Sequence, residues 1–428
     1  MIKIVKADGK AERDFLAQLR QRSGDTDKKV TEIVSAILDD VRSEGDEAVK
    51  KYTARFDTST PEFYEVPRDV IDNAEKECDS ELIAAMKRAA ENIKDFHNRQ
   101  VQQSWLTAKD NGVILGQRIR GLHRVGVYVP GGTAALFSSV LMNVIPAKIA
   151  GVGEIIMATP PCKDGSANRD ILAAAAIAGV DRVFLCGGAQ AIGSFAYGTA
   201  EIPKVDKIVG PGNIFVATAK RLVYGTVDID MIAGPSEILI VADETADPKF
   251  LAADLMSQAE HDRLASAILV TTCGELAQKT DAELVRQCAQ MSRREIIEES
   301  IANYGGIIIC DSLDDAVEMA NELAPEHLEV CVENPMEYIG RFDNAGSVFL
   351  GHYAPEPLGD YFAGPNHVLP TSGTARFFSP LSVDAFIKKS SFIYYNENAL
   401  REVRNDVVLM AENESLTAHA NAVKVRFE

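Results

Sequence analysis

The chain has 428 residues, of which 46% are hydrophobic and 25% are charged, and its formal net charge at pH 7 is −19. A chain of this length is too long for one ordinary hydrophobic core, so we expect two main domains. The acidic balance, without a basic cluster, argues against nucleic acid as a partner. No stretch approaches the roughly 20 apolar residues that cross a bilayer, so we expect no membrane partner.

The first residues and the cysteines predict a cytoplasmic protein. The N-terminal sequence MIKIVKADGKAERDF lacks the apolar run and small-residue cleavage site of a secretory signal. The cysteines are odd in number, scattered and never spaced as CxxC, so we interpret them as buried thiols in a reducing compartment. They are Cys78, Cys162, Cys186, Cys273, Cys288, Cys310 and Cys331.

Helical spacing dominates the sequence from about Asp25 to Phe96. The segments VTEIVSAILDDV and ELIAAMKRAAENI repeat apolar residues at intervals of three and four. From about Gly121 the pattern changes to short β-rich runs, each followed by glycine or proline and then by a helical pattern. The runs are RVGVYVPGG, GEIIMATPP, DRVFLCGGAQ and DKIVGPGN. This alternation predicts parallel βαβ units.

A second series of the same construction follows, with the runs EILIVAD, SAILVTT, GGIIICD, LEVCVE and GSVFLG. We therefore predict an α/β fold with two incomplete doubly wound, Rossmann-like parallel-sheet domains and a helical N-terminal layer. After about Ser379 the sequence is polar and helical in pattern, and it is too short to enclose a core. Such an extended helical C-terminal tail must pack on its own body or on a partner subunit.

Glycine-rich turns follow several strands of the first series, at Gly131-Gly132, Gly187-Gly188 and Gly210-Pro211-Gly212. Backbone N–H groups and helix N-termini at such turns can hold phosphate. The phrase CGGAQAIG, which contains Gln190, comes nearest to a GxGxxG motif, and Asp206 lies about 20 residues further on, where a ribose-binding acid could sit. Tight turns also need glycine for steric reasons alone, so nucleotide binding stays open on these residues.

The segment from Asp247 to Val270 brings two metal-ligating residue types together. Asp247 and Pro248 are typical of a helix start, and we expect the helix to run to about Asp262. Gln258 and His261, three residues apart, lie on neighbouring ridges near its C-terminal end. On these residues alone, the plainer interpretation is a helix end with two solvated polar side chains.

Glu326 and His327 follow Pro325 at the start of a predicted strand. Histidine can act as a general base near neutral pH, and a neighbouring glutamate can activate water. Adjacent residues on a strand point to opposite faces, so both serve one site only if the backbone turns there. Polar residues at the surface are the alternative interpretation.

Two further acid–imidazole pairs occur near the C-terminus. Asp360 and His367 fall in a Gly/Pro-rich run, for which we predict an ordered loop of about 20 residues without secondary structure. Glu414 and His419 are five residues apart in the tail, which places them roughly 140° apart on an ideal helix. That pair converges only at a helix end.

Several long phrases carry a resemblance to a known family. They are RVGVYVPGG, SSVLMNVIPAKIAGV, IPKVDKIVGPGNIFVATAKR, IAGPSEILIVAD, SQAEHD, APEHLEV, LGDYFAGPNHVLPTSGTARF and AHANAV. From about Thr26 to the C-terminus the chain resembles the histidinol dehydrogenases. The resemblance implies an NAD-dependent zinc enzyme that oxidises L-histidinol to L-histidine with two NAD⁺ and one water, the last step of histidine biosynthesis. It also implies a homodimer with shared active sites.

The resemblance assigns roles to individual residues. It implies that His327 takes the alcohol proton and that Glu326, with His327, activates water. The implied ligands of one Zn²⁺ per subunit are Gln258, His261, Asp360 and His419, with His419 reaching the neighbouring subunit. The implied NAD contacts are Tyr128, Gln190 and Asn213. The implied substrate contacts are Ser236, Gln258, His261, His327, Asp360, His367, Glu414 and His419.

With these roles, the chain divides into four parts. We expect residues 1–23 to form an N-terminal arm and residues 120–235 to form a Rossmann-like domain on the NAD side. Residues 24–119 and 236–378 are expected to form a discontinuous α/β domain that carries the metal site. Residues 379–428 are the expected tail that reaches the partner subunit.

The chain departs from the family pattern at a few positions. Ser415 stands where the family has glycine, Arg263 where it usually has proline, Cys186 where a small residue is common, and Thr133 where lysine is frequent. The first two bear on substrate fit. A similar fold and zinc set serve dehydrogenases of other primary alcohols, such as a sulfonated propanediol, but Glu414 favours histidinol. A non-catalytic metal-dependent binding protein is the alternative from another class, and the intact Glu326-His327 pair argues against it.

Overall fold

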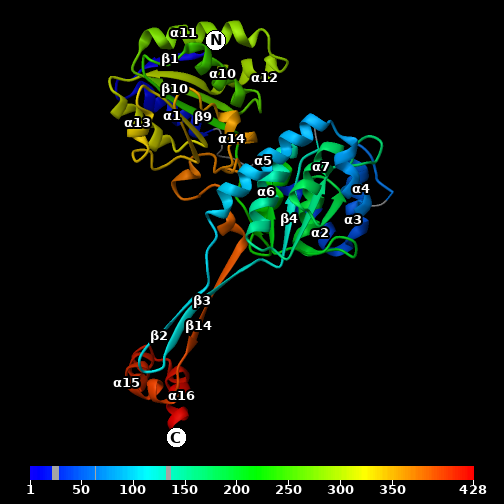
Figure 1. Ribbon diagram of the computed structural model, residues 1–428, viewed down its shortest axis with the longest axis vertical. Coiled ribbons are helices and arrows are strands. Elements are labelled where there is room, and N and C mark those ends of the chain that lie inside the picture. The colour runs from blue at the N-terminus through cyan, green and yellow to red at the C-terminus, as the bar shows by residue number, and fades with distance from the viewer. Residues whose placement is uncertain (22–27, 63, 132–135) are drawn as a thin grey trace.

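The computed structural model describes residues 1–428 except 22–27, 63 and 132–135. Within these residues two parallel sheets with helices packed around them form two lobes, and a long arm extends from them (Figure 1). Each sheet separates two clusters of buried apolar side chains, so helices cover both of its faces. The predicted α/β fold with Rossmann-like parallel sheets is confirmed.

The first lobe is built on a five-stranded sheet with the order β6-β5-β4-β7-β8. Its strands are β4 (Arg124–Tyr128), β5 (Glu154–Thr159), β6 (Arg182–Leu185), β7 (Lys207–Val209) and β8 (Asp228–Ile229). The connecting helices are α6 (Phe137–Ile149), α7 (Arg169–Ala178), α8 (Gly188–Tyr197) and α9 (Ile214–Val223). Because helices cover both faces, the strands read as continuous apolar runs rather than as an alternating pattern.

The second lobe is built on a six-stranded sheet with the order β1-β11-β10-β9-β12-β13. Its strands are β1 (Lys3–Lys6), β9 (Glu237–Ala242), β10 (Ser266–Thr271), β11 (Gly305–Ile309), β12 (His327–Cys331) and β13 (Ser347–Leu350). Its helices are α1 (Ala11–Gln21), α10 (Pro248–Ala259), α11 (Gly274–Cys288), α12 (Arg294–Tyr304), α13 (Leu313–Leu323) and α14 (Glu356–Tyr361). Apart from the added edge strand β1, both sheets have the order of an incomplete doubly wound fold.

The helical N-terminal layer packs on the five-stranded sheet. It consists of α2 (Lys28–Glu44), α3 (Asp46–Phe56), α4 (Arg68–Asn73) and α5 (Ser80–Asn98). Leu38 of α2 shares a core with Phe184 of β6, and Ile93 of α5 shares one with Val127 of β4. The assignment of residues 24–119 to the same domain as 236–378 is therefore wrong for these helices. Helical spacing shows that a helix has an apolar face, but both sheets offer a surface to cover.

The expected N-terminal arm is part of the second lobe. Its strand β1 pairs with β11 at the edge of the six-stranded sheet, and Phe15 and Leu16 are buried in that lobe's core. The expected boundary between residues 23 and 24 lies outside the described residues.

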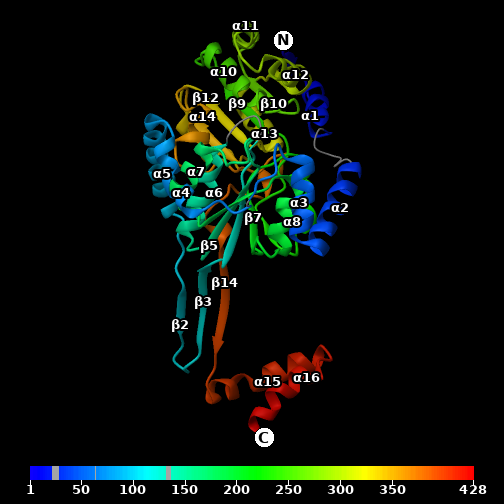
Figure 2. The ribbon, with the colours of Figure 1, turned by 90° about the vertical axis from the view of Figure 1, so that its right-hand side faces the viewer.

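The arm at the other end of the chain is a three-stranded antiparallel sheet that ends in two helices. Its strands, in the order β14-β3-β2, are β2 (Trp105–Ala108), β3 (Ile114–Gly121) and β14 (Ile387–Tyr394). Figure 2 shows α15 (Glu397–Asn413) and α16 (Thr417–Lys424) at the tip, away from both lobes. The tail expected to be helical from residue 379 thus contains the strand β14 before its two α-helices. Leu381 and Phe386 are still buried in the first lobe, and β14 finds a partner in β3.

Five short 3₁₀ helices complete the described secondary structure. They are η1 (Ala74–Glu77), η2 (Pro335–Tyr338), η3 (Thr374–Arg376), η4 (Val383–Phe386) and η5 (Val425–Phe427). Among the described residues, no helix combines the length and the apolar composition that a membrane crossing requires.

The turn between α15 and α16 holds Ser415 in a conformation that favours glycine. Its φ is +61°, the Leu416 N–H donates to the Ala411 carbonyl at 2.8 Å, and this pattern is that of a left-handed helix C-cap. We predict that Ser415→Gly stabilises the α15–α16 pair by about 1 kcal/mol, because a side chain at positive φ costs roughly 1–2 kcal/mol. Hydrogen exchange of the α15 and α16 amides measures this. Ser415→Ala keeps the Cβ and should give no gain; equal slowing in both variants would contradict the strain argument.

Candidate active site

Glu326 and His327 lie at the amino ends of two neighbouring parallel strands. His327 opens β12 and pairs with Ile238 of β9. Ligands of open α/β sheets usually lie at the carboxyl ends of the strands. In the second lobe, the predicted catalytic residues therefore lie at the opposite ends of the strands, the amino ends.

One residue, Glu237, holds both of these side chains. The Glu237 N–H donates to Glu326 Oε2 at 2.9 Å, and the Glu237 carbonyl lies 3.0 Å from His327 Nδ1. The backbone turns before β12, so Glu326 Oε2 and His327 Nδ1 are 3.6 Å apart. The turn needed to bring the pair into one site is thus present.

The hydrogen bond to Glu237 sets the state of the His327 ring. Because a carbonyl only accepts, Nδ1 carries the proton and Nε2 is the unprotonated nitrogen. His327 is 4% exposed, and burial lowers its pKa to about 3. Burial also raises the pKa of Glu326 well above its ordinary value, against the effect of the Glu237 N–H. The site thus presents a neutral imidazole beside a buried carboxyl group.

Gln258 and His261 come from the end of α10. Asp247 caps this helix through the Lys249 N–H at 2.8 Å, and Pro248 is its first residue, as the sequence predicts. The helix ends at Ala259, and His261 follows it as an exposed residue. Gln258 is 1% exposed, and within the described residues neither atom of its amide makes a hydrogen bond of ordinary length, although the amide lies near enough to Glu356 to oppose the rise in the pKa of that carboxyl group. Such burial costs about 1–3 kcal/mol, which a ligand at this amide would offset.

Asp360 lies on α14, so the expectation of a loop without secondary structure is wrong here. Pro355 and Pro357 flank Glu356 at the start of this short helix, where proline is favoured. Glu356, four residues before Asp360, is also part of the site: it is buried, and its Oε1 lies 3.6 Å from His327 Nε2. Glu356 is not among the site residues predicted from the sequence. The signal was the spacing of four, which places two carboxylates on one helix face.

His327, Glu356 and Asp360 form the group of the described residues that could hold a metal ion, with possible ligand atoms all within 4.8 Å of one another. Imidazole nitrogen and carboxylate oxygen are ligands that suit Zn²⁺. Burial and the charge of Asp360 raise the pKa of Glu356 to about 8, and burial raises that of Asp360 to about 6. A divalent cation would relieve this crowding of acids, so the site fits a metal. This group shares only Asp360 with the predicted ligand set.

A second buried acid fixes α14 to the sheet. Glu329, two residues after His327 on β12, accepts the Glu356 N–H through Oε1 at 2.8 Å. Burial raises the pKa of both Glu329 and Asp254, to about 6 for Asp254. The charge of Asp254 adds to the rise at Glu329, and the charge of Glu356 adds to the rise at Asp254. The buried carboxyl group of Glu329 thus holds the helix that carries Glu356 and Asp360.

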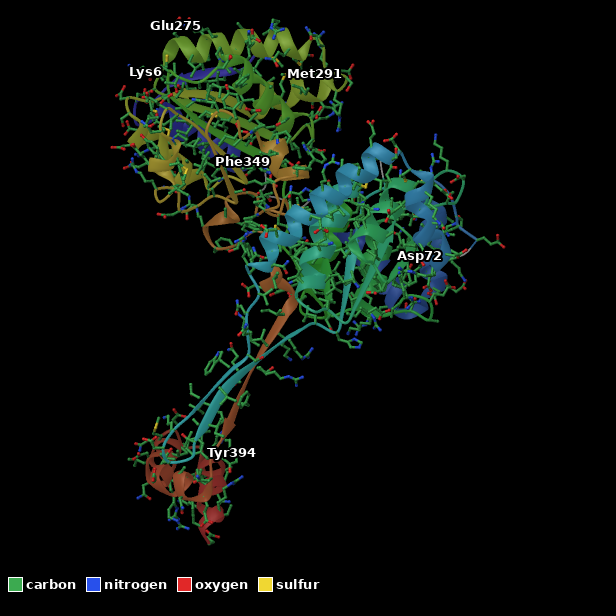
Figure 3. All side chains as sticks on the ribbon, viewed as in Figure 1. Lys6, Asp72, Glu275, Met291, Phe349 and Tyr394 are labelled. Atoms are coloured by element: carbon green, nitrogen blue, oxygen red, sulfur yellow. The ribbon has the colours of Figure 1, made fainter. Side chains whose placement is uncertain are left out.

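The other predicted residues of this lobe border the same group. His367 Nδ1 lies 3.1 Å from the Asp360 backbone carbonyl, and burial lowers the pKa of His367 to about 4. Ser236 directly precedes Glu237, and its carbonyl accepts the Ser266 N–H at 3.0 Å. The ring of Phe349, labelled in Figure 3, lies 6.1 Å from that of His327.

Asp360 also borders the first lobe. A cavity of about 180 Å³ is lined by apolar residues of α5 and α6 and by Asp360, Tyr361 and Phe362. The candidate site therefore opens toward the boundary between the two lobes.

The structure leaves Glu414 and His419 away from this group. Both are exposed on the helical tip of the arm, beyond Tyr394, which is labelled in Figure 3. The remaining departures from the family pattern lie elsewhere: Arg263 forms a surface ion pair with Glu299, and Cys186 is buried in the first lobe. Thr133 and Gly132 lie outside the described residues.

The predicted NAD contacts lie at the carboxyl ends of the first lobe's strands. Tyr128 ends β4, and its hydroxyl accepts the Gly188 N–H at 3.0 Å. Gln190 is in the first turn of α8, and Asn213 caps α9 through the Phe215 N–H at 3.0 Å. Asp206 is placed differently from the expected ribose acid. It accepts the His123 N–H at 3.0 Å, ahead of β4, and so lies at the amino ends of the strands.

Comparison with known proteins identifies the family. The sequence model of the histidinol dehydrogenases matches residues 20–427. This chain belongs to the histidinol dehydrogenase family. It is 56% identical to a histidinol dehydrogenase of Clostridium acetobutylicum over 100% of this chain and 99% of that protein. The corresponding protein of Lactococcus lactis is 50% identical, with both chains covered to 100%.

The fold agrees with that of a solved structure of the family. The crystal structure of histidinol dehydrogenase from Elizabethkingia anophelis superposes with a TM-score of 0.92 at 39% identity, covering 99% of this chain and 98% of that one. Membership of this dehydrogenase family makes the chain an oxidoreductase.

The buried His327 predicts an acid-dependent loss of stability in the metal-free protein. Its folded pKa of about 3 lies below the ordinary value, so below about pH 6.5 the unfolded chain binds a proton that the folded chain does not. Stability is therefore lost as pH falls from about 6.5 toward 3. Between pH 7 and pH 5, chelator-treated wild type should lose about 2 kcal/mol more than His327→Asn.

Urea unfolding at the two pH values measures this difference. The control is His123→Asn, because His123 is exposed and should leave the wild-type pH dependence intact. Identical pH dependence in wild type and His327→Asn would mean that His327 is not held neutral in the folded chain.

Proposed function

We propose that the chain catalyses the four-electron oxidation of L-histidinol to L-histidine through the aldehyde, with two NAD⁺ and one water. The observation that carries this proposal is the neutral His327, whose Nε2 is free of protons while Nδ1 is held by the Glu237 carbonyl. A buried imidazole with one fixed tautomer can act as a general base without first losing a proton. Family membership supports the choice of substrate.

The protein side of the reaction needs two roles. His327 Nε2 would take the proton of the substrate alcohol while a hydride leaves for the first NAD⁺. Glu326, 3.6 Å from His327 Nδ1, would then help to activate the water that adds to the aldehyde, and the hydrate would yield the second hydride. Glu356, facing His327 Nε2, would limit the space at the base and contact the reacting group.

Zinc would be held by Gln258, His261, Asp360 and His419 of the partner subunit. When bound there, zinc would supply a fixed attachment point that binds and orients the amine and imidazole of the substrate. Two observations support this ligand set. The buried Gln258 amide makes no hydrogen bond of ordinary length within the described residues, and Asp360 belongs to the donor group with His327 and Glu356.

Substrate and cofactor would meet at the boundary of the lobes. Ser236, His367 and the partner subunit's Glu414 would contact the substrate beside His327 and the metal ligands. Tyr128, Gln190 and Asn213 would contact NAD from the first lobe. The proposal includes a homodimer, because Glu414 and His419 lie on an arm that leaves its own body.

The reaction predicts a fixed stoichiometry. Zinc-loaded protein with limiting histidinol and excess NAD⁺ should form two NADH per histidinol, measured by absorbance, with histidine as the product. Treatment with a strong chelator should remove activity, and added zinc should restore it. Negligible NADH from histidinol alongside rapid turnover of another primary alcohol would overturn the choice of substrate.

The shared site predicts recovery of activity in mixed dimers. His419→Ala and His327→Asn subunits should each be nearly inactive alone, because each homodimer lacks one group in both sites. After subunit exchange at equal amounts, about one quarter of wild-type activity should return, since half of the dimers would contain one complete site. A mixture of His327→Asn with Glu326→Gln subunits is the control and should not recover. Exchange demonstrated by mass spectrometry without recovery would argue against a ligand contributed by the partner.

A further inference from the structure

Asp57 lies at the carboxyl ends of the strands of the five-stranded sheet, although it comes from a segment that is not part of the sheet. It follows α3, and the next two residues fix this segment to the loop after β5. Thr58 Oγ1 donates to the Pro161 carbonyl and Ser59 Oγ to the Cys162 carbonyl, both at 2.6 Å. Asp57 Oδ2 accepts the Gly187 N–H at 3.1 Å, at the end of β6. Asp57 is partly exposed as a residue, although burial raises the pKa of its carboxyl group.

This position corresponds to that of the ribose-binding acid in a Rossmann fold. In such folds the acid that binds the ribose hydroxyl groups follows the second strand. Here β4, β5 and β6 have the places of the first, second and third strands. The second strand, β5, is followed directly by Pro160, Pro161 and Cys162, and the first acid of this loop, Asp164, is exposed and accepts the Ser166 N–H within its own turn. Asp57, which follows α3, supplies a carboxylate at this end of the sheet.

Unpartnered buried atoms at the end of β5 and in the first turn of α8 point to a polar ligand. Gln190 Nε2 donates to Asp57 Oδ2 at 3.4 Å, while Gln190 Oε1 has no partner within the described residues and the residue is 1% exposed. Thr159 Oγ1, at the end of β5, is also buried and without a partner there. A Cβ at Gly187 would lie 2.4 Å from Asp57 Oδ1, so glycine is what admits the carboxylate.

The start of α8 suits hydroxyl groups better than phosphate. The Gly187 and Gly188 N–H groups, which could bind an anion, are already used by Asp57 and the Tyr128 hydroxyl. Asp57 also brings a negative charge to this helix N-terminus, which would repel phosphate. A sugar diol, in contrast, can donate hydrogen bonds to the carboxylate.

We propose that Asp57 accepts a hydrogen bond from a ribose hydroxyl group of NAD and thereby makes the site select NAD over NADP. The 2′-phosphate of NADP removes that donor and places negative charge against the carboxylate. This inference rests on the NAD-dependent oxidation proposed above. It adds a residue from the helical N-terminal layer to the cofactor site.

The test compares NADH and NADPH binding to the full-length, zinc-loaded protein by fluorescence titration without histidinol. Wild type should bind NADH at least about tenfold more tightly than NADPH. Asp57→Asn keeps the shape of the side chain but removes its charge. This variant should weaken NADH binding about tenfold, as expected for the loss of a charged hydrogen bond. The preference for NADH over NADPH should fall by a similar factor. In the steady state, the loss should fall on the KM for NAD⁺ rather than on kcat or the KM for histidinol.

Asp164→Asn is the matched control. Asp164 lies in the same β5–α7 loop, but its carboxylate is exposed and accepts the Ser166 N–H at 3.1 Å within its own turn. This variant removes the same charge and should keep the wild-type preference. If Asp57→Asn does not fold, Asp57→Ser, which keeps an acceptor for the Gly187 N–H, replaces it.

Equal binding of NADH and NADPH by wild type would overturn the proposal without any variant. An Asp57 variant that keeps wild-type preference, or an Asp164→Asn variant that loses it equally, would also overturn it. These outcomes are independent of the substrate. If the preference depends on Asp57 but histidinol is not oxidised, the proposed function fails and the cofactor assignment stands.

Discussion

The candidate active site depends on the peptide groups of Glu237. Its N–H holds Glu326 and its carbonyl holds His327, so one residue orients both side chains. Glu237 is the first residue of β9, which lies between β10 and β12 inside the six-stranded sheet. A buried carboxyl group and a buried imidazole need hydrogen-bond partners, and here the backbone of an interior strand supplies them. Their geometry is therefore as rigid as the sheet.

The alternation of side chains along β12 connects the Glu326–His327 pair to α14, the helix that carries Glu356 and Asp360. His327 and Glu329 are two residues apart and share one side of the strand. Glu329 then binds the first N–H of α14, which fixes Glu356 and Asp360 opposite His327. The result is a crowded group of acids whose pKa values rise because burial and mutual repulsion oppose ionisation. Such a group is costly in the absence of a cation, and this cost favours metal binding.

The sequence predicts the parallel sheets because buried strands and helices alternate with clear turn signals. It does not predict which sheet the helical layer packs on, because apolar side chains such as Leu38 and Ile93 can be buried against either sheet. Within the site, Asp247 and Pro248 predict the start of α10. The order of the two series of strands along the chain predicts two separate lobes. Glu356 was missed because prolines around a six-residue helix conceal its spacing. The roles of Gln258 and His261 came from family resemblance, since no spacing rule connects them to Asp360.

The arm connects the proposed active site to formation of the proposed dimer. Ile393, Leu409 and Met410 on the arm are more than 60% exposed. Large apolar side chains displayed in this way favour burial against another chain. Glu414 and His419 are on the same tip, so a contact that covers these side chains would also deliver the two groups missing from the body. In the proposed dimer, burial of apolar surface would therefore drive completion of the site, and activity would depend on association rather than on the fold of one chain.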